Sequence, residues 1–116
     1  MKDMEKITTK FEKEIESKEK LVTELNKKGK QLLDLQLNYA SERNKILTTT
    51  DWEEKIVGKV TDKAKNAYAD DQLQEKDTEI KWLENDISII RKNIELCNDK
   101  ISLYKYMIRE LEIVGL

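Results

Sequence analysis

A heptad repeat of apolar residues dominates the second half of this sequence and constrains its fold more than any other feature. Position a carries isoleucine five times between residues 80 and 111, and position d carries only apolar residues and one cysteine. The a residues are Ile80, Ile87, Ile94, Ile101 and Ile108, and the d residues are Leu83, Ile90, Cys97, Tyr104 and Leu111. This pattern predicts a long helix whose seam packs against another helix.

The first half carries a weaker version of the same repeat. With Met4 at position a, the a residues are Met4, Phe11, Lys18, Leu25, Leu32, Tyr39 and Ile46. Position d alternates between apolar and polar side chains, in the order Ile7, Glu14, Leu21, Lys28, Leu35, Glu42 and Thr49. Proline is absent, so no residue forces a helix to stop. We expect Gly29 to be tolerated inside the helix, and a C-cap that ends a first helix there is the alternative.

The composition agrees with long amphipathic helices. Charged residues make up 40% of the 116 residues and apolar residues 38%. The net charge is −2, and only residues 51–79 are biased, with 5 basic and 9 acidic side chains. We therefore expect neither direct nucleic-acid binding nor attraction to an anionic membrane. No apolar run is long enough for a signal peptide or a membrane span, which favours a cytoplasmic location.

The stretch "TTTDWEEKIVGKVTDKAKNAY" at residues 48–68 separates the two repeats. Thr50 with Glu53 matches a capping box, Gly58 offers a stop, and Thr61 offers a second N-cap. We predict a single domain over 1–116, with a helix over 3–47, an elbow over 48–61 containing a short helix over 51–57, and a long helix over 62–113. A connection this short predicts an antiparallel return, so the expected fold is all-α, a long coiled-coil-like helical hairpin.

The hairpin prediction implies a register. If the chain turns near residue 56, apolar a residues of the two helices face each other, for example Leu25 and Ile87. The predicted hairpin core consists of Phe11, Leu25, Leu32, Ile80, Ile87, Ile94, Ile101 and Ile108. A continuous parallel coiled coil remains the alternative, because isoleucine at a with large apolar residues at d also suits parallel pairs.

A second apolar stripe lies at position c of the isoleucine-rich segment. Its members are Trp82, Ile89, Leu96 and Leu103. Position c lies about 100° from d, so the apolar arc is wider than one partner helix covers. We predict that another copy of the protein buries the stripe, which makes a homo-oligomeric multi-helix bundle. A groove for a helix of a different protein is the alternative.

Catalytic chemistry has little support in this sequence. Histidine is absent, Cys97 is the only cysteine, and "VGKV" lacks the remainder of a phosphate-binding loop. The carboxylates alternate with lysines in the manner of a solvated helix face. We predict a protein that is not an enzyme and that has no cofactor and no metal site, with Cys97 serving as a small buried residue of the seam.

The elbow and the segment that follows it contain the remaining candidate binding residues. Trp52 either plugs the end of the hairpin core or inserts into a partner. The acidic residues beyond it either form a solvated face or compete for a basic groove of a partner protein, as a nucleic-acid mimic does. The candidate partner-binding residues are Trp52, Asp62, Asp70, Asp71, Glu75 and Asp77.

Thr49, Asp51 and Trp52, followed by residues 65–68 (KNAY), give the chain a resemblance to a known group. It resembles small helical-hairpin proteins encoded by phages and prophages of low-GC bacteria, in which a "T-x-D-W" motif precedes an isoleucine-rich helix. Most such proteins have no assigned function. The resemblance implies a phage accessory protein, with inhibition of a host defence enzyme as one option.

Overall fold

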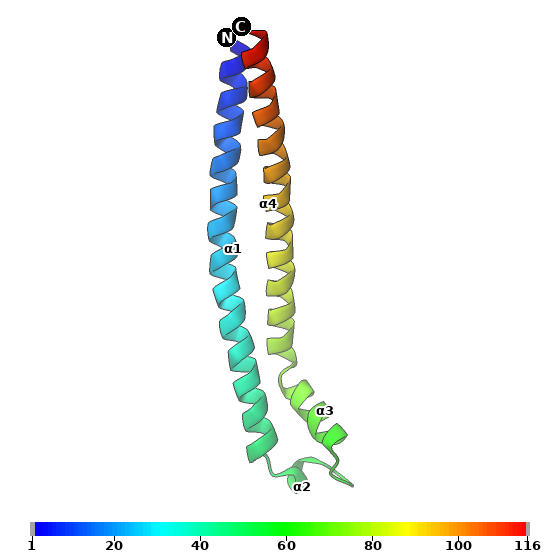
Figure 1. The fold of residues 1–116 in the computed structure, drawn as a ribbon. Helices are drawn as coiled ribbons and strands as arrows, with labels where there is room; N and C mark the ends of the chain where they lie inside the picture. The colour runs from blue at the N-terminus through cyan, green and yellow to red at the C-terminus, as the bar shows by residue number, and fades with distance from the viewer. Residues whose placement is uncertain (1, 116) are drawn as a thin grey trace. The chain divides into compact units, whose positions relative to one another are not determined.

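The computed structural model describes residues 2–115, and over that range the chain is helical with no strand (Figure 1). The helices are α1 (Lys2–Thr49), α2 (Trp52–Lys55), α3 (Asp62–Gln72) and α4 (Gln74–Val114). Helix α1 packs against helix α4, so the chain is an all-α helical hairpin, as the two heptad repeats predict. Within the described range, no helix combines the length and apolar character that crossing a bilayer requires.

The hairpin divides into two compact units. The first joins the residues up to Lys28 with those from Asp86 onward, and the second comprises Gly29–Asn85. In the first unit Lys28 lies beside Asp86, whereas the earlier Ile15 lines a groove with the later Ile101. Residue numbers therefore fall along one helix as they rise along the other, so the two helices are antiparallel. The two helices of this chain therefore do not pair in the parallel orientation.

The a and d residues of α4 form the seam with α1. Ile80, Ile87, Ile90 and Cys97 are buried, at 5–8% relative exposure. The other six members of the predicted hairpin core are half-buried, and no described residue of α1 is fully buried. A seam between only two helices explains this thin core, because each side chain keeps one edge open to water.

Charged residues at the d positions of α1 find partners across the seam. Lys28 Nζ lies 3.3 Å from Asp86 Oδ2 in the first unit. In the second unit, Glu42 forms an ion pair with Lys76, whose ammonium also donates to Asn38 at 2.8 Å. Because these side chains are only partly buried, each pair contributes about 0–1 kcal/mol. The Lys28–Asp86 and Lys76–Asn38 contacts each lie two residues from the predicted register. Glu42 would face residue 70 in that register, six residues from its partner Lys76.

The elbow differs from its prediction at the first cap. Thr50 does not cap a helix N-terminus, because its hydroxyl donates to the carbonyl of Ile46 in the last turn of α1. Asp51 is instead the N-cap residue of α2, and its side chain makes no capping hydrogen bond. Helix α2 has only four residues, fewer than predicted, since the backbone is already extended at Ile56. The second cap is as predicted: Thr61 Oγ1 accepts from the Ala64 amide at 3.1 Å.

The predicted helix over 62–113 is interrupted at Leu73, which separates α3 from α4. The Leu73 amide still donates to the Ala69 carbonyl at 3.1 Å, and the Leu73 carbonyl accepts from Asp77 at 2.9 Å. No glycine or proline marks the break in the sequence. Ala69 and Leu73 are instead the two most buried residues described, at 0% and 2% exposure. Packing of these side chains within the second unit outweighs the propensity of the segment to continue as one helix.

Substitution by alanine is expected to change the free energy of unfolding in opposite directions at two glycines. Gly29 lies inside α1, and nothing stands within 4 Å of where a Cβ would be. Gly58 has a φ of 95°, a backbone conformation that alanine adopts only under strain. Gly29→Ala should therefore raise the free energy of unfolding by about 0.5–1 kcal/mol, and Gly58→Ala should lower it by about 1 kcal/mol or more. Urea denaturation followed by circular dichroism measures both, and equal effects of the two substitutions would contradict this interpretation.

Candidate functional site

An exposed apolar stripe on α4 is the strongest candidate for a functional surface. In the first unit, Ile89, Leu96 and Leu103 at position c are 48%, 57% and 55% exposed. Their immediate neighbours in the seam, Ile90 and Cys97, are buried. The stripe therefore takes no part in the core of the hairpin. Trp82 occupies the same heptad position but belongs to the second unit, where it is also exposed.

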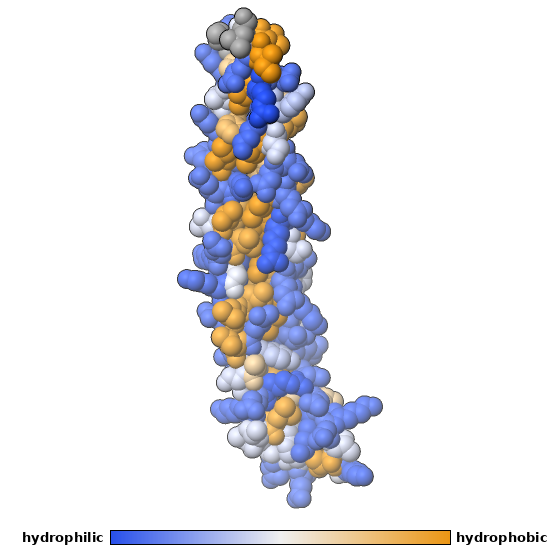
Figure 2. Space-filling model, in the orientation of Figure 1, coloured by the Kyte–Doolittle hydropathy of each residue, from blue (hydrophilic) through white to orange (hydrophobic). Residues whose placement is uncertain are grey.

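Two further exposed residues extend this face and were missed from the sequence. Tyr106 and Ile113 are each 60% exposed and occupy heptad position f, three residues after c. Six of the seven large exposed hydrophobic residues of α4 lie at c or f. The signal was available in the heptad frame, because c and f are spaced as a and d are. In the view of Figure 2, the hydrophobic surface follows the line along which α1 and α4 meet, with hydrophilic side chains on both sides of it.

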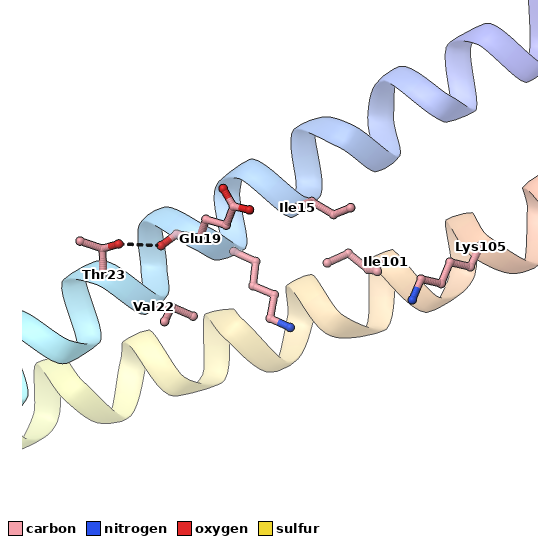
Figure 3. Close-up of a pocket in the computed structure, with 7 residues that line it drawn as sticks. Ile15, Glu19, Val22, Thr23, Ile101 and Lys105 are labelled. Atoms are coloured by element: carbon pink, nitrogen blue, oxygen red, sulfur yellow. Dashed lines mark hydrogen bonds between the residues drawn. The ribbon is translucent and has the colours of Figure 1, made fainter.

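A groove lies between the helices of the first unit, with a volume of ≈ 530 Å³. Its apolar lining is Ile15 and Val22 of α1 with Ile101 of α4, and Figure 3 shows Ile15 and Ile101 close together. Lys18, Glu19 and Thr23 of α1 with Lys105 of α4 complete the lining. Ile101 and Lys105 occupy positions a and e, whereas the stripe lies beyond position d. The groove and the stripe are therefore on opposite sides of the α4 seam.

Trp52 is held within the second unit. Its ring meets the edge of Tyr68 with 5.5 Å between the ring centroids, at an interplanar angle of 86°. The Lys65 ammonium lies 5.7 Å from the Trp52 ring centroid, within reach of a cation–π interaction. Trp52 is half-buried, as are Ile56 and Val60. These contacts favour the interpretation of Trp52 as a plug of the elbow, while a partner-binding role stays a prediction.

The acidic candidate residues of α3 and α4 differ in their surroundings. Asp70 forms an ion pair with Arg43, and this hydrogen bond raises the pKa of Arg43. Asp77 Oδ2 lies 2.9 Å from Lys81 Nζ, and that hydrogen bond raises the pKa of Lys81. The other three candidates, Asp62, Asp71 and Glu75, are exposed and make no ion pair with any described residue. The acidic patch is therefore partly neutralised from within the chain.

Cys97 lies in the seam of the first unit. Burial raises the pKa of its thiol, and the nearby Glu14 carboxylate raises it further. A neutral, enclosed thiol is a poor nucleophile at neutral pH. Among residues 2–115, no three Asp, Glu, Cys or His side chains gather in a way that would hold a metal ion.

Comparison with known proteins gives no match. No protein-family model, no curated protein and no solved structure matches the chain. The assignment of a function therefore rests on the surfaces described above.

Proposed function

We propose that this chain is a non-enzymatic helical interaction module that self-associates through the stripe of Ile89, Leu96 and Leu103. One observation supports the proposal above all others: these large apolar side chains stand about half exposed at heptad spacing, beside a seam that is already filled. Water-exposed apolar residues repeating along one helix face are typical of a contact with another helix.

The energetics favour a partner on this face. Full burial of a leucine or isoleucine side chain contributes roughly 1.5–3 kcal/mol, and these three residues still have about half of that area to bury. A second copy of the chain carries the same stripe, so self-association requires no other protein. Its products would be multi-helix bundles, because each copy contributes a hairpin of two long helices.

The first experiment replaces the stripe by polar residues. The triple variant Ile89→Gln, Leu96→Gln and Leu103→Gln should give a lower molar mass in light scattering than the unaltered chain, with its helicity retained. The matched control places the same three glutamines one residue earlier, at Ser88, Glu95 and Ser102, which are exposed and polar. The control should keep the mass of the unaltered chain. An unchanged mass in the stripe variant would contradict self-association through this face.

A second candidate is inhibition of a host enzyme through a basic groove, as the resemblance to phage accessory proteins implies. The observation in its favour is that Asp62, Asp71 and Glu75 are exposed and make no ion pair with any described residue. On this proposal the protein is encoded by a phage and acts in the host cytoplasm. Asp70 and Asp77 contribute less, because Arg43 and Lys81 already neutralise them.

Charge reversal tests this second candidate. Asp62, Asp71 and Glu75 changed together to lysine should abolish capture of a host protein in a pull-down from bacterial lysate, with the circular dichroism spectrum unchanged. The control reverses Glu12, Glu16 and Glu19, exposed carboxylates of α1 in the other unit, and should keep the captured protein. Equal capture by both variants would contradict binding through Asp62, Asp71 and Glu75.

A further inference from the structure

We infer that a row of lysines along the outer side of α1 is a binding surface for the phosphate backbone of a nucleic-acid duplex. The inference goes beyond the proposed self-association and does not depend on it, because it concerns a different helix. With Met4 at position a, position c of α1 carries lysine in four consecutive heptads, all within the first unit. The members of this lysine row are Lys6, Lys13, Lys20 and Lys27.

The lysine row is open to solvent and is not neutralised by ion pairs within the chain. All four side chains are exposed, and none of them forms an ion pair with another described residue. They recur every seven residues, so the row spans roughly 30 Å along one side of α1. Positive charges repeated over this length match an extended polyanion better than a single small anion.

The positive charge is most concentrated in the first turns of α1, around a shallow hollow of ≈ 440 Å³. The hollow is lined by Lys2, Glu5, Lys6, Thr9, Lys10 and Lys13. All six side chains are exposed. Four lysines and one carboxylate give the hollow a net positive charge, which attracts phosphate groups.

The spacing of the lysines around the hollow is unfavourable for an isolated helix. Lys2 and Lys6 are four residues apart, as are Lys6 and Lys10, and Lys13 follows Lys10 by three. Like charges at these spacings repel each other on a helix surface. A phosphate group between the ammonium groups would remove this repulsion. A local arrangement that opposes folding in this way is typical of a functional surface.

The net charge of the whole chain conceals this face of α1. Among residues 2–28, positions c, f and g carry six lysines and three carboxylates, whereas the other four positions carry two lysines and four carboxylates. The carboxylates at c, f and g are Asp3, Glu16 and Glu24. The expectation of no direct nucleic-acid binding was drawn from the net charge and took no account of this segregation. A duplex meets one face of a protein, so the charge of that face determines the attraction.

A duplex fits this face better than a lipid bilayer or a single strand does. Positions c, f and g of residues 2–28 carry no apolar or aromatic side chain. Helices that lie on a bilayer bury an apolar face in it, and proteins that bind single strands stack the bases on aromatic side chains. Lysines alone contact phosphates without reading the sequence, and duplex DNA offers about one negative charge per 1.7 Å of its length.

Neutralisation of the hollow tests the inference. The quadruple variant carries Lys2→Gln, Lys6→Gln, Lys10→Gln and Lys13→Gln. Its binding to a labelled DNA duplex of about 24 base pairs is measured by fluorescence anisotropy at about 50 mM salt, and the dissociation constant should rise by about a hundredfold. Circular dichroism should show that helicity is retained, because the substitutions remove charges that repel each other.

The matched control neutralises four exposed lysines of the second unit and therefore has the same net charge. It carries Lys45→Gln, Lys55→Gln, Lys59→Gln and Lys63→Gln. The control should bind the duplex about as tightly as the unaltered chain. Equal losses in the quadruple variant and in this control would overturn the inference, because binding would then follow net charge and not the lysine row.

Two further measurements examine the same surface. For four phosphate contacts, the logarithm of the association constant should fall against the logarithm of the salt concentration with a slope of about −3 to −4, and the quadruple variant should lose most of this slope. Glu5→Gln removes the carboxylate of the hollow and should lower the dissociation constant about two- to fivefold. A salt slope that is equal in the unaltered chain and the quadruple variant would contradict phosphate contacts by these lysines.

The choice of ligand is tested with three probes, which are the DNA duplex, an RNA duplex of the same length and vesicles containing phosphatidylserine. Binding to either duplex supports the inference, and the ratio of the two dissociation constants shows which form the face prefers. Binding to the vesicles and to neither duplex would overturn it and would assign the face to a membrane. Failure of the unaltered chain to bind any of the three probes would also overturn it.

Discussion

Truncation of Ile90 to alanine is expected to lower the free energy of unfolding by about 2–4 kcal/mol. Ile90 is 5% exposed in the seam of the first unit, so the substitution removes buried methyl groups and leaves a cavity between the two helices. A seam between two helices contains few other fully buried side chains, so little other packing compensates for the lost contacts. Chemical denaturation followed by far-ultraviolet circular dichroism measures the effect.

The adjacent residue is the matched control. Ile89→Ala removes the same atoms from the same helix, but Ile89 is about half exposed and lies outside the seam. In a sample dilute enough to be monomeric, this substitution should cost less than about 1 kcal/mol. The substitution should instead weaken self-association. Equal losses for Ile89→Ala and Ile90→Ala would contradict the division of α4 into a filled seam and an open stripe.

Leu73→Ala is expected to have an effect of similar size in the second unit, about 2–4 kcal/mol. Leu73 is 2% exposed at the break between α3 and α4, and Ala69, one turn earlier, is also buried, at 0% exposure. Both tryptophans of the chain, Trp52 and Trp82, belong to this unit. Tryptophan fluorescence therefore follows unfolding of the second unit, and its transition should shift to lower denaturant concentration.

Leu37→Ala provides the comparison for Leu73→Ala. Leu37 lies in α1 of the same unit and is exposed, so its truncation should shift the fluorescence transition by less than a third as much. If Leu73→Ala leaves the fluorescence transition in place, burial at the break does not stabilise the second unit. Because the chain divides into two units, fluorescence and circular dichroism need not report one common transition.

The heptad frame together with the short connection was sufficient to predict the hairpin from the sequence. Ile87, Ile90 and Cys97 fall at a and d and are buried, because a period of seven places them on one face. The charged d residues of α1 also face the seam, where Lys28 meets Asp86. A heptad assignment depends only on the spacing of apolar residues along one segment, so it can be made without knowing which helix that segment packs against.

Features that depend on packing between segments could not be predicted in the same way. The break at Leu73 has no glycine or proline to announce it and follows from burial within the second unit. Thr50 matched a capping box, yet its hydroxyl bonds backward to Ile46, since threonine can satisfy either helix end. Tyr106 is exposed because the seam is filled without it, and only its position f in the heptad frame indicated this beforehand.

The charges on the inner face of α1 also affect what the chain pairs with while it folds. Glu14, Lys28 and Glu42 recur at position d every fourteen residues. If α1 of one molecule paired in register with α1 of another, each of these charges would meet its own kind across the contact. Within one molecule, Lys28 and Glu42 meet opposite charges on α4. Newly made chains at high local concentration are therefore biased toward closing on themselves before they exchange helices with their neighbours.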